Sequence, residues 1–367
     1  MQEKIVSIHH LRGIAALLVV FFHFRFYLNG VYAQSDLGYL LFGGGAFGVD
    51  LFFMISGFII AASTQRKVTV ASFITRRFFR IYPAFLAVFL VGAFTVYSLV
   101  PYSVLLRSMF FIHKDYTQVS PGFGYNLLGP AWTLTYELYF YALFVLAIWI
   151  NQAPRIFITS ILIVLPFVSV QLAYSGTVSI AGNASPNIPS DSDFYSILRF
   201  IGSPIILEFI LGMFLYYLYS NVKIKVKKEQ AKFVLLICIG VALSFYFKNQ
   251  HSGFGLQDFG LWSFILLFGC LFYEKSHALK ENKTLSFLGD ISYSLYISHY
   301  LLTYTLEIYK HEILLEFNGI SRFILVATAC IVAATILHYV VERPFIKVGK
   351  VIDNFVKTKY GSTKIAS

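Results

Sequence analysis

Hydrophobic residues along the chain come in long runs that are separated by short polar segments. Each run is close to the roughly 17 to 25 residues that an α-helix needs to cross a bilayer. One of the polar segments between the runs extends from Gly176 to Asp193. The pattern predicts an all-α, polytopic integral membrane protein with about ten transmembrane helices, at about 13–28, 46–64, 81–100, 130–150, 156–174, 197–219, 233–249, 256–273, 286–306 and 320–341.

The composition favours the same fold class. Hydrophobic residues make up 57% of the chain and charged residues 13%, far from the balance of a soluble globular protein. We expect one transmembrane domain over residues 1–346 and a short basic cytoplasmic tail over residues 347–367. The first span contains polar residues and no clear cleavage site follows it, so we expect it to be retained. The three cysteines all lie in predicted spans, which argues against a disulfide framework.

Lysines and arginines predict the orientation. If the N-terminus is cytoplasmic and there are ten spans, 22 of the 29 Lys and Arg residues lie on the cytoplasmic side, as the positive-inside rule requires. We therefore expect both termini in the cytoplasm. The formal net charge of +11 is then a topology signal, and it gives no reason to expect nucleic-acid binding.

The first span, HHLRGIAALLVVFFHF (residues 9–24), contains Arg12 and His23. Residues 11 apart on an α-helix differ by about 20° in direction and by about 16 Å in height, so the two side chains share one face. His23 is expected about halfway to two-thirds across the membrane, where an ionisable side chain is costly and indicates function. We interpret Arg12 and His23 as catalytic candidates, with His23 as a general base. The alternative is that Arg12 extends to the headgroups and His23 is a packing residue.

The next polar residue is Asp50, in GGGAFGVDLFFMISGFII (residues 43–60). Asp50 lies just inside the second span and is a catalytic candidate that could orient His23. Alternatively, it stabilises the first turn of its own helix. We expect Ser56 and Gly57, further along, to allow tight helix contact.

Arginines gather in RRFFRIYPAF, where the second span has returned to the inner surface. Arg77 and Arg80 are three residues apart and point the same way on a helix. With Arg76 they form a guanidinium cluster of the type that binds phosphate oxygens. We assign Arg76, Arg77, Arg80 and Tyr82 to a site for a phosphate-bearing cofactor. The alternative is ordinary positive-inside charge.

Two further spans carry polar residues. GPAWTLTYELYFYALF (residues 129–144) contains Glu137, which is a catalytic candidate because a carboxylate at this depth needs a partner or a cavity. Trp132 and Tyr136 of the same stretch are candidate platforms for a sugar ring. LGDISYSLYISHYLL adds His299, as a substrate-binding candidate or a packing histidine.

Taken together, R-x10-H, GVDLFFMISGF, RRFFRIYP, WTLTYELYFY, SYSLYISHY and the terminal ERPF closely resemble the membrane acyltransferase-3 family. The resemblance runs in order from Leu11 to Phe345, and it is greatest to the single-domain enzymes that acetylate exopolysaccharide or O-antigen. It implies a bacterial inner-membrane enzyme that uses cytoplasmic acetyl-CoA and a hydroxyl of a surface polysaccharide or lipid-linked sugar. By position, Arg12, His23 and Glu137 match functional residues of the family, and Arg77 and Arg80 match its R-x-x-R motif.

A mechanism combines both lines of argument. The arginines hold the nucleotide end of acetyl-CoA, and its pantetheine arm rises along the first helix to His23. His23 then either takes the proton of the acceptor hydroxyl or carries the acetyl group transiently, and the sequence leaves both open. The histidines show no metal-ligand spacing within one helix, so we expect no metal. The alternative function is a transporter or flippase for a lipid-linked sugar, because intramembrane ionisable residues also mark transport paths.

Overall fold

The computed structural model describes residues 5–66, 68–248, 252–309 and 316–361 of the chain. Within these ranges every regular element is helical, which confirms the all-α prediction. The first half contains α1 (Val6–Phe24), η1 (Arg25–Leu28), α2 (Leu37–Phe42), η2 (Gly43–Phe47), α3 (Gly48–Ser63), α4 (Val70–Phe94), α5 (Tyr102–Met109), η3 (Gly129–Ala131), α6 (Trp132–Ile150) and α7 (Arg155–Ser175). The second half contains α8 (Tyr195–Ile201), η4 (Pro204–Ile206), α9 (Leu207–Asn221), α10 (Lys228–Lys248), α11 (Phe259–Ser276), α12 (Lys283–Tyr309), α14 (Gly319–Leu337), η5 (His338–Glu342) and α15 (Arg343–Gly361).

Eight helical segments of the described residues are long and apolar enough to cross a membrane. They correspond to eight of the ten expected spans, while the expected spans 256–273 and 286–306 coincide with α11 and α12, which fall outside this set. The count of ten and the cytoplasmic termini therefore stay predictions. The segments are Val6–Leu28, Leu37–Ser63, Val70–Phe94, Gly129–Ile150, Arg155–Ser175, Pro204–Asn221, Lys228–Lys248 and Gly319–Lys357.

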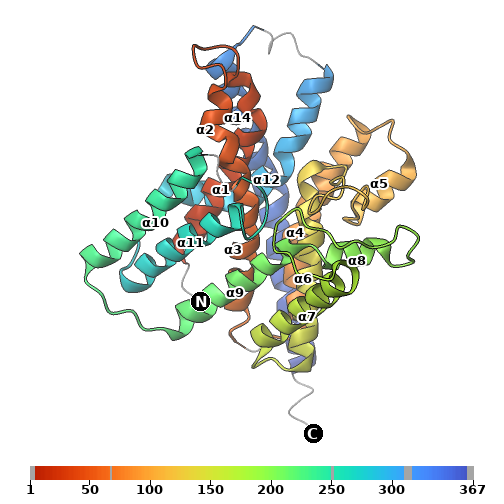
Figure 1. Ribbon diagram of the computed structural model, residues 1–367, viewed down its shortest axis with the longest axis vertical. Helices are drawn as coiled ribbons and strands as arrows, with labels where there is room; N and C mark the ends of the chain where they lie inside the picture. Colours follow the sequence, from red (N-terminus) through yellow and green to blue (C-terminus); the bar gives the residue numbers. More distant parts are fainter. Residues whose placement is uncertain (1–4, 67, 249–251, 310–315, 362–367) are drawn as a thin grey trace.

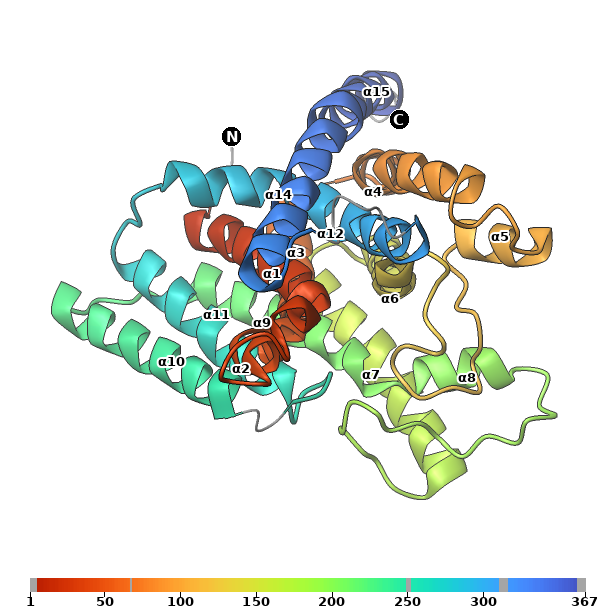
Figure 2. The ribbon, with the colours of Figure 1, turned by 90° about the horizontal axis from the view of Figure 1, so that it is seen from above.

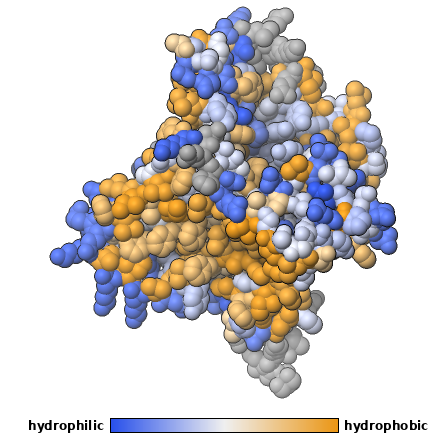
Figure 3. Space-filling model, in the orientation of Figure 1, coloured by the Kyte–Doolittle hydropathy of each residue, from blue (hydrophilic) through white to orange (hydrophobic). Residues whose placement is uncertain are grey.

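The surface has the polarity of a membrane protein. Figure 3 shows a broad apolar band over α9 and α10, with hydrophilic residues at the lower left edge and over the loops on the right. Large apolar side chains are exposed on several spans, for example Phe157 at 67%, Leu165 at 63% and Phe233 at 65%. Such a surface is stable against lipid tails and would be costly in water.

Helix α1 lies in the middle of the bundle, beside α3, α11, α12 and α14 (Figures 1 and 2). Its contact with α12 is close because a glycine on each helix faces the other. A Cβ atom on Gly13 would lie 2.6 Å from the backbone nitrogen of Gly289. On α3, Gly57 faces the carbonyl oxygen of Phe209 in α9 in the same way. Small residues therefore allow both helix pairs to approach at backbone distance, as is common in membranes.

The N-terminal end of α1 is held by another helix. The carboxylate of Glu274, on α11, accepts hydrogen bonds from the backbone nitrogens of Val6 and Ser7 at 2.6 and 2.9 Å. These nitrogens have no partner within their own helix, and a negative charge is favourable at this end of the helix dipole. As a result α1 begins seven residues earlier than the hydrophobic run, and Arg12 lies inside the helix.

Helix α15 continues from α14 through the π-helical turn η5 and lies along α4 (Figure 2). Asp353 on α15 is buried, and it pairs with Arg76 on α4 at 2.7 Å. It also accepts a hydrogen bond from Ser72. The helix crosses the expected boundary at residue 346 without a break, so the division into a domain and a tail remains a sequence prediction.

Candidate functional site

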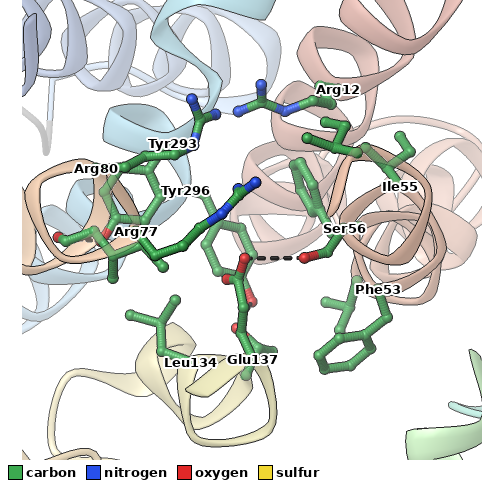
Figure 4. A pocket seen from close by; sticks show the side chains of 15 residues that line it. Arg12, Phe53, Ile55, Ser56, Arg77, Arg80, Leu134, Glu137, Tyr293 and Tyr296 are labelled. Atoms are coloured by element: carbon green, nitrogen blue, oxygen red, sulfur yellow. Dashed lines mark hydrogen bonds between the residues drawn. The ribbon is translucent and has the colours of Figure 1, made fainter. Parts of the chain in front are cut away.

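Three arginines and a glutamate line a cavity between α1, α3, α4, α6 and α12, which we call the arginine cavity. It has a volume of about 90 Å³. Arg12 enters from α1, Arg77 and Arg80 from α4, and Glu137 from α6 (Figure 4). These four residues, separated widely in the sequence, were all predicted as site residues, and the fold brings them together.

Positive charge exceeds negative charge in the arginine cavity. Glu137 accepts hydrogen bonds from Ser56, at 3.0 Å, and from Tyr141. Arg77 donates to the Ser63 hydroxyl at 2.8 Å. The lining thus holds three guanidinium groups and one carboxylate. Like charges in a low-dielectric site repel strongly, so the cavity favours an anionic ligand.

A second cavity, of about 440 Å³, lies at the other end of α1. We call it the histidine cavity, because His23 lines it together with Arg25, Trp132 and Tyr300. The His23 ring contacts the rings of His299 and Tyr300, with centroids 5.1 and 5.3 Å apart. Aromatic walls of this kind suit the apolar faces of sugar rings, while a ring nitrogen of His23 can exchange a proton.

Val49 and Tyr296 line both cavities and form the wall between them. The hydroxyl of Tyr296 lies 3.2 Å from the Thr133 hydroxyl and 3.4 Å from the carbonyl oxygen of Pro130, at the start of α6. Its ring packs against Phe52. Arg12 and His23 lie on the same helix, and each lines one of these two adjoining cavities.

His299 and Trp132 belong to the histidine end of the site. His299 is fully buried, and its Nδ1 lies 3.1 Å from the carbonyl oxygen of Leu295, so Nδ1 is the donor in this hydrogen bond. Trp132 lines the cavity and packs edge-on against Phe254. The structure thus places His299 against the His23 ring but outside the cavity lining, and Trp132 in the lining of the same cavity as His23.

Four other predicted residues lie outside both cavities. Arg76 points to Asp353, and Tyr82 lines a neighbouring apolar groove of about 500 Å³. Asp50 accepts a hydrogen bond from the backbone of Gly255 at 2.7 Å and faces Glu208 on α9, so it is not placed to orient His23.

Tyr136, the fourth of these residues, holds a loop. Its hydroxyl donates to the carbonyl oxygen of Pro121 at 2.9 Å, and its ring stacks on Phe200. The aromatic platform that the sequence predicted at the start of α6 is therefore Trp132 alone, because the side chain four residues later points away from the cavity.

The sequence reasoning did not assign a role to several residues of the site. Ser56 was expected only to allow helix contact, but its hydroxyl orients Glu137. Arg25 directly follows α1 and lines the histidine cavity. Glu208 interrupts the apolar run PIILEFILG, and this signal could have identified it as the partner of Asp50. The described residues contain no cluster of His, Cys, Asp and Glu that could hold a metal ion.

Comparisons with known proteins identify the family. A family model described as an acyltransferase domain, acyltransferase 3, matches residues 5–339. The exopolysaccharide production protein ExoZ of Rhizobium meliloti (strain 1021) is 29% identical over 70% of this chain and 75% of its own length. The acyltransferase MdmB of Streptomyces mycarofaciens is 26% identical over 57% of this chain and 56% of its own.

A third relative is longer than this chain. It is a Staphylococcus aureus (strain COL) protein named as a proposed O-acetyltransferase, and it is 23% identical over 88% of this chain but 57% of its own length. No solved structure is similar at a significant level. Because the family model covers most of the chain and the helices have the length and polarity of membrane spans, the protein belongs to the acyltransferase-3 family and is a multi-pass membrane acyltransferase.

Proposed function

We propose that this protein transfers an acetyl group from cytoplasmic acetyl-CoA to a hydroxyl of a surface polysaccharide or lipid-linked sugar, in the bacterial inner membrane. One observation carries the proposal. A single helix presents Arg12 to a cationic cavity at one end and His23 to an aromatic cavity at the other. The name of the ExoZ relative supports a polysaccharide acceptor, and that of the Staphylococcus relative supports acetyl transfer.

In the proposed mechanism the arginine cavity binds the donor. Arg77 and Arg80 face the predicted cytoplasmic side and bind phosphate oxygens of the nucleotide end, because guanidinium groups form paired hydrogen bonds to phosphate. Arg12 lines the same cavity from α1, and its charge attracts the pantetheine amide oxygens. Glu137, held by Ser56 and Tyr141, limits the excess positive charge. The acetyl end then reaches the wall formed by Val49 and Tyr296.

The histidine cavity binds the acceptor. Its hydroxyl oxygen attacks the thioester carbonyl carbon while His23 takes the hydroxyl proton. The carbon–sulfur bond then breaks, and the CoA thiolate leaves and receives the proton from His23, so that charge and atoms balance. In the second version a His23 nitrogen attacks first and the acetyl group passes from it to the hydroxyl. His299 packs against His23 and fixes the orientation of its ring.

Label transfer in a reconstituted system tests this function. The purified protein is placed in liposomes with acetyl-CoA labelled in the acetyl group on one side and an oligosaccharide acceptor on the other. We expect label on the oligosaccharide, at a mass gain of one acetyl group. Movement of an oligosaccharide across the bilayer with no label transfer would instead favour a flippase.

A further inference from the structure

The histidine cavity has an unbalanced charge. Apart from His23, the ionisable groups among the described lining residues are tyrosines and Arg25, and these described residues include no carboxylate and no lysine. The other described lining residues are apolar, aromatic or small. The cavity therefore presents one permanent positive charge to whatever it binds.

The guanidinium group of Arg25 has hydrogen-bond donors that are not used within the described protein. It stacks on the Phe22 ring, 3.9 Å from the centroid, and donates one hydrogen bond to the carbonyl oxygen of Phe22. A guanidinium has five N–H donors. In the part of the chain that the structure describes, no carboxylate lies within ion-pair distance of Arg25. Most of its donors are thus available, and its plane is fixed by the ring beneath it.

The position of Arg25 in the chain also indicates a binding role. Arg25 follows His23 by two residues, at the end of α1, and both line the same cavity. A basic residue at a helix C-terminus is stabilised by the helix dipole, and this accounts for a positive charge at this end of α1. It does not account for a cavity of about 440 Å³ that holds this charge beside aromatic walls, with no carboxylate among its described lining residues.

We propose that the acceptor carries an anionic group, a carboxylate or a phosphate, close to the hydroxyl that is acylated, and that Arg25 binds this group. The inference rests on the proposed function, because it assigns the acceptor to the histidine cavity. Arg25 then acts as a specificity residue. It places the anionic group at the mouth of the cavity, so that a neighbouring hydroxyl on the same sugar lies at His23.

Acceptor binding in the absence of acetyl-CoA tests the inference. The probes are a glucuronate-containing oligosaccharide, the matched glucose oligosaccharide and glucose 6-phosphate, titrated calorimetrically against the protein in nanodiscs. A hydrogen-bonded ion pair in a partly buried site contributes about 10- to 100-fold in affinity. We expect the wild type to prefer an anionic probe over the neutral one by this factor, and the preference to fall at high salt. The glucuronate and phosphate probes show which anionic group is recognised.

Variants separate recognition from structure. Arg25→Gln is expected to abolish the preference and leave the affinity for the neutral oligosaccharide unchanged, whereas Arg25→Lys keeps part of it. Arg322→Gln is the matched control, because Arg322 stacks on Tyr27 outside the cavity lining. Equal wild-type affinity for charged and neutral probes overturns the inference. The inference is also overturned if Arg25→Gln lowers the affinity for all probes equally, since Arg25 would then only support the end of α1.

The two proposals can fail separately. If the wild type prefers the anionic probe but transfers no label to any glycan, the acyl transfer proposed above is wrong and the anion site stands. If label transfer occurs equally to charged and neutral oligosaccharides, the function stands and the anion site is wrong.

Discussion

At the scale of single residues, the site consists of a few ionisable side chains whose neighbours decide their roles. His23 contacts His299 and Tyr300 through its ring. Within the described chain no protein group lies at hydrogen-bond distance from its ring nitrogens, so they remain available to substrates. The neighbours of the arginines also decide their roles. Arg80 lines the arginine cavity, whereas Arg76, four residues earlier, is paired with Asp353.

Replacing His23 by alanine should abolish acyl transfer without unfolding the protein. General-base help is typically worth about 10² to 10⁴ in rate, so transfer should fall by at least this factor in either version of the mechanism. Donor binding should persist, because the arginines lie in the other cavity. Label transfer and calorimetric titration with CoA measure the two effects. Near-normal transfer by His23→Ala would show that another residue carries the proton.

Arg80→Gln and Arg76→Gln should behave differently although both remove one arginine from the same helix. Loss of a charged hydrogen bond to phosphate costs about 1.5–3 kcal/mol, so Arg80→Gln should raise the KM for acetyl-CoA about tenfold or more. Arg76→Gln breaks the pair with Asp353 and should lower the thermal stability of the protein with little change in KM. If both variants raise the KM for acetyl-CoA equally, donor binding depends on the positive charge of this helix in general and not on the arginine cavity.

At the scale of elements, α6 and α12 together control the connection between the cavities. Tyr296 of α12 is held against the start of α6 by the hydroxyl of Thr133 and the carbonyl group of Pro130. Because these groups come from two helices, a small relative movement of α6 and α12 would move the phenol ring. The wall between the cavities can therefore open only when the helices shift or the ring rotates.

Tyr296→Ala should uncouple cleavage of acetyl-CoA from transfer of the acetyl group to the acceptor. With the ring removed, water from the histidine cavity reaches the thioester and cleaves it to acetate and CoA. We expect CoA release without acceptor to increase and transfer to the oligosaccharide to decrease, as measured by thiol detection and by label. Tyr296→Phe keeps the ring and loses only the hydroxyl contacts, so it should hydrolyse much less acetyl-CoA. Wild-type hydrolysis by Tyr296→Ala would show that the ring is no barrier.

At the scale of the whole molecule, close packing of a few helix pairs fixes the two ends of the site relative to each other. Gly13→Val should disrupt the contact of α1 with α12, because the added carbon atoms would overlap the backbone at Gly289. Overpacking of this kind costs about 1–3 kcal/mol. Thermal unfolding in detergent measures the loss. Gly240→Val is the control, since a Cβ there meets no atom within 4 Å; equal losses would mean that glycine flexibility, not packing, is responsible.

The sequence predicts those parts of the site that depend on local geometry. Helix periodicity suffices to place Arg12 and His23 on one face, and Arg77 and Arg80 on another. It cannot show that Arg76 turns away, because its partner Asp353 lies 277 residues further along the chain. Nor can it show that Asp50 faces Glu208 rather than His23, since this depends on how α3 packs on α9. Long-range pairing of polar groups is decided by tertiary packing, which periodicity does not contain.

The cap that Glu274 provides to α1 has a consequence for donor choice. The first turn of α1 is bonded to α11 and the helix packs closely on α12, and both contacts oppose sliding of α1 along its axis. The helix then holds Arg12 and His23 at a fixed separation of about 16 Å along its axis. The proposed mechanism therefore requires a donor whose flexible arm spans this distance, and we expect thioesters on shorter carriers to be poor substrates whatever acyl group they bear.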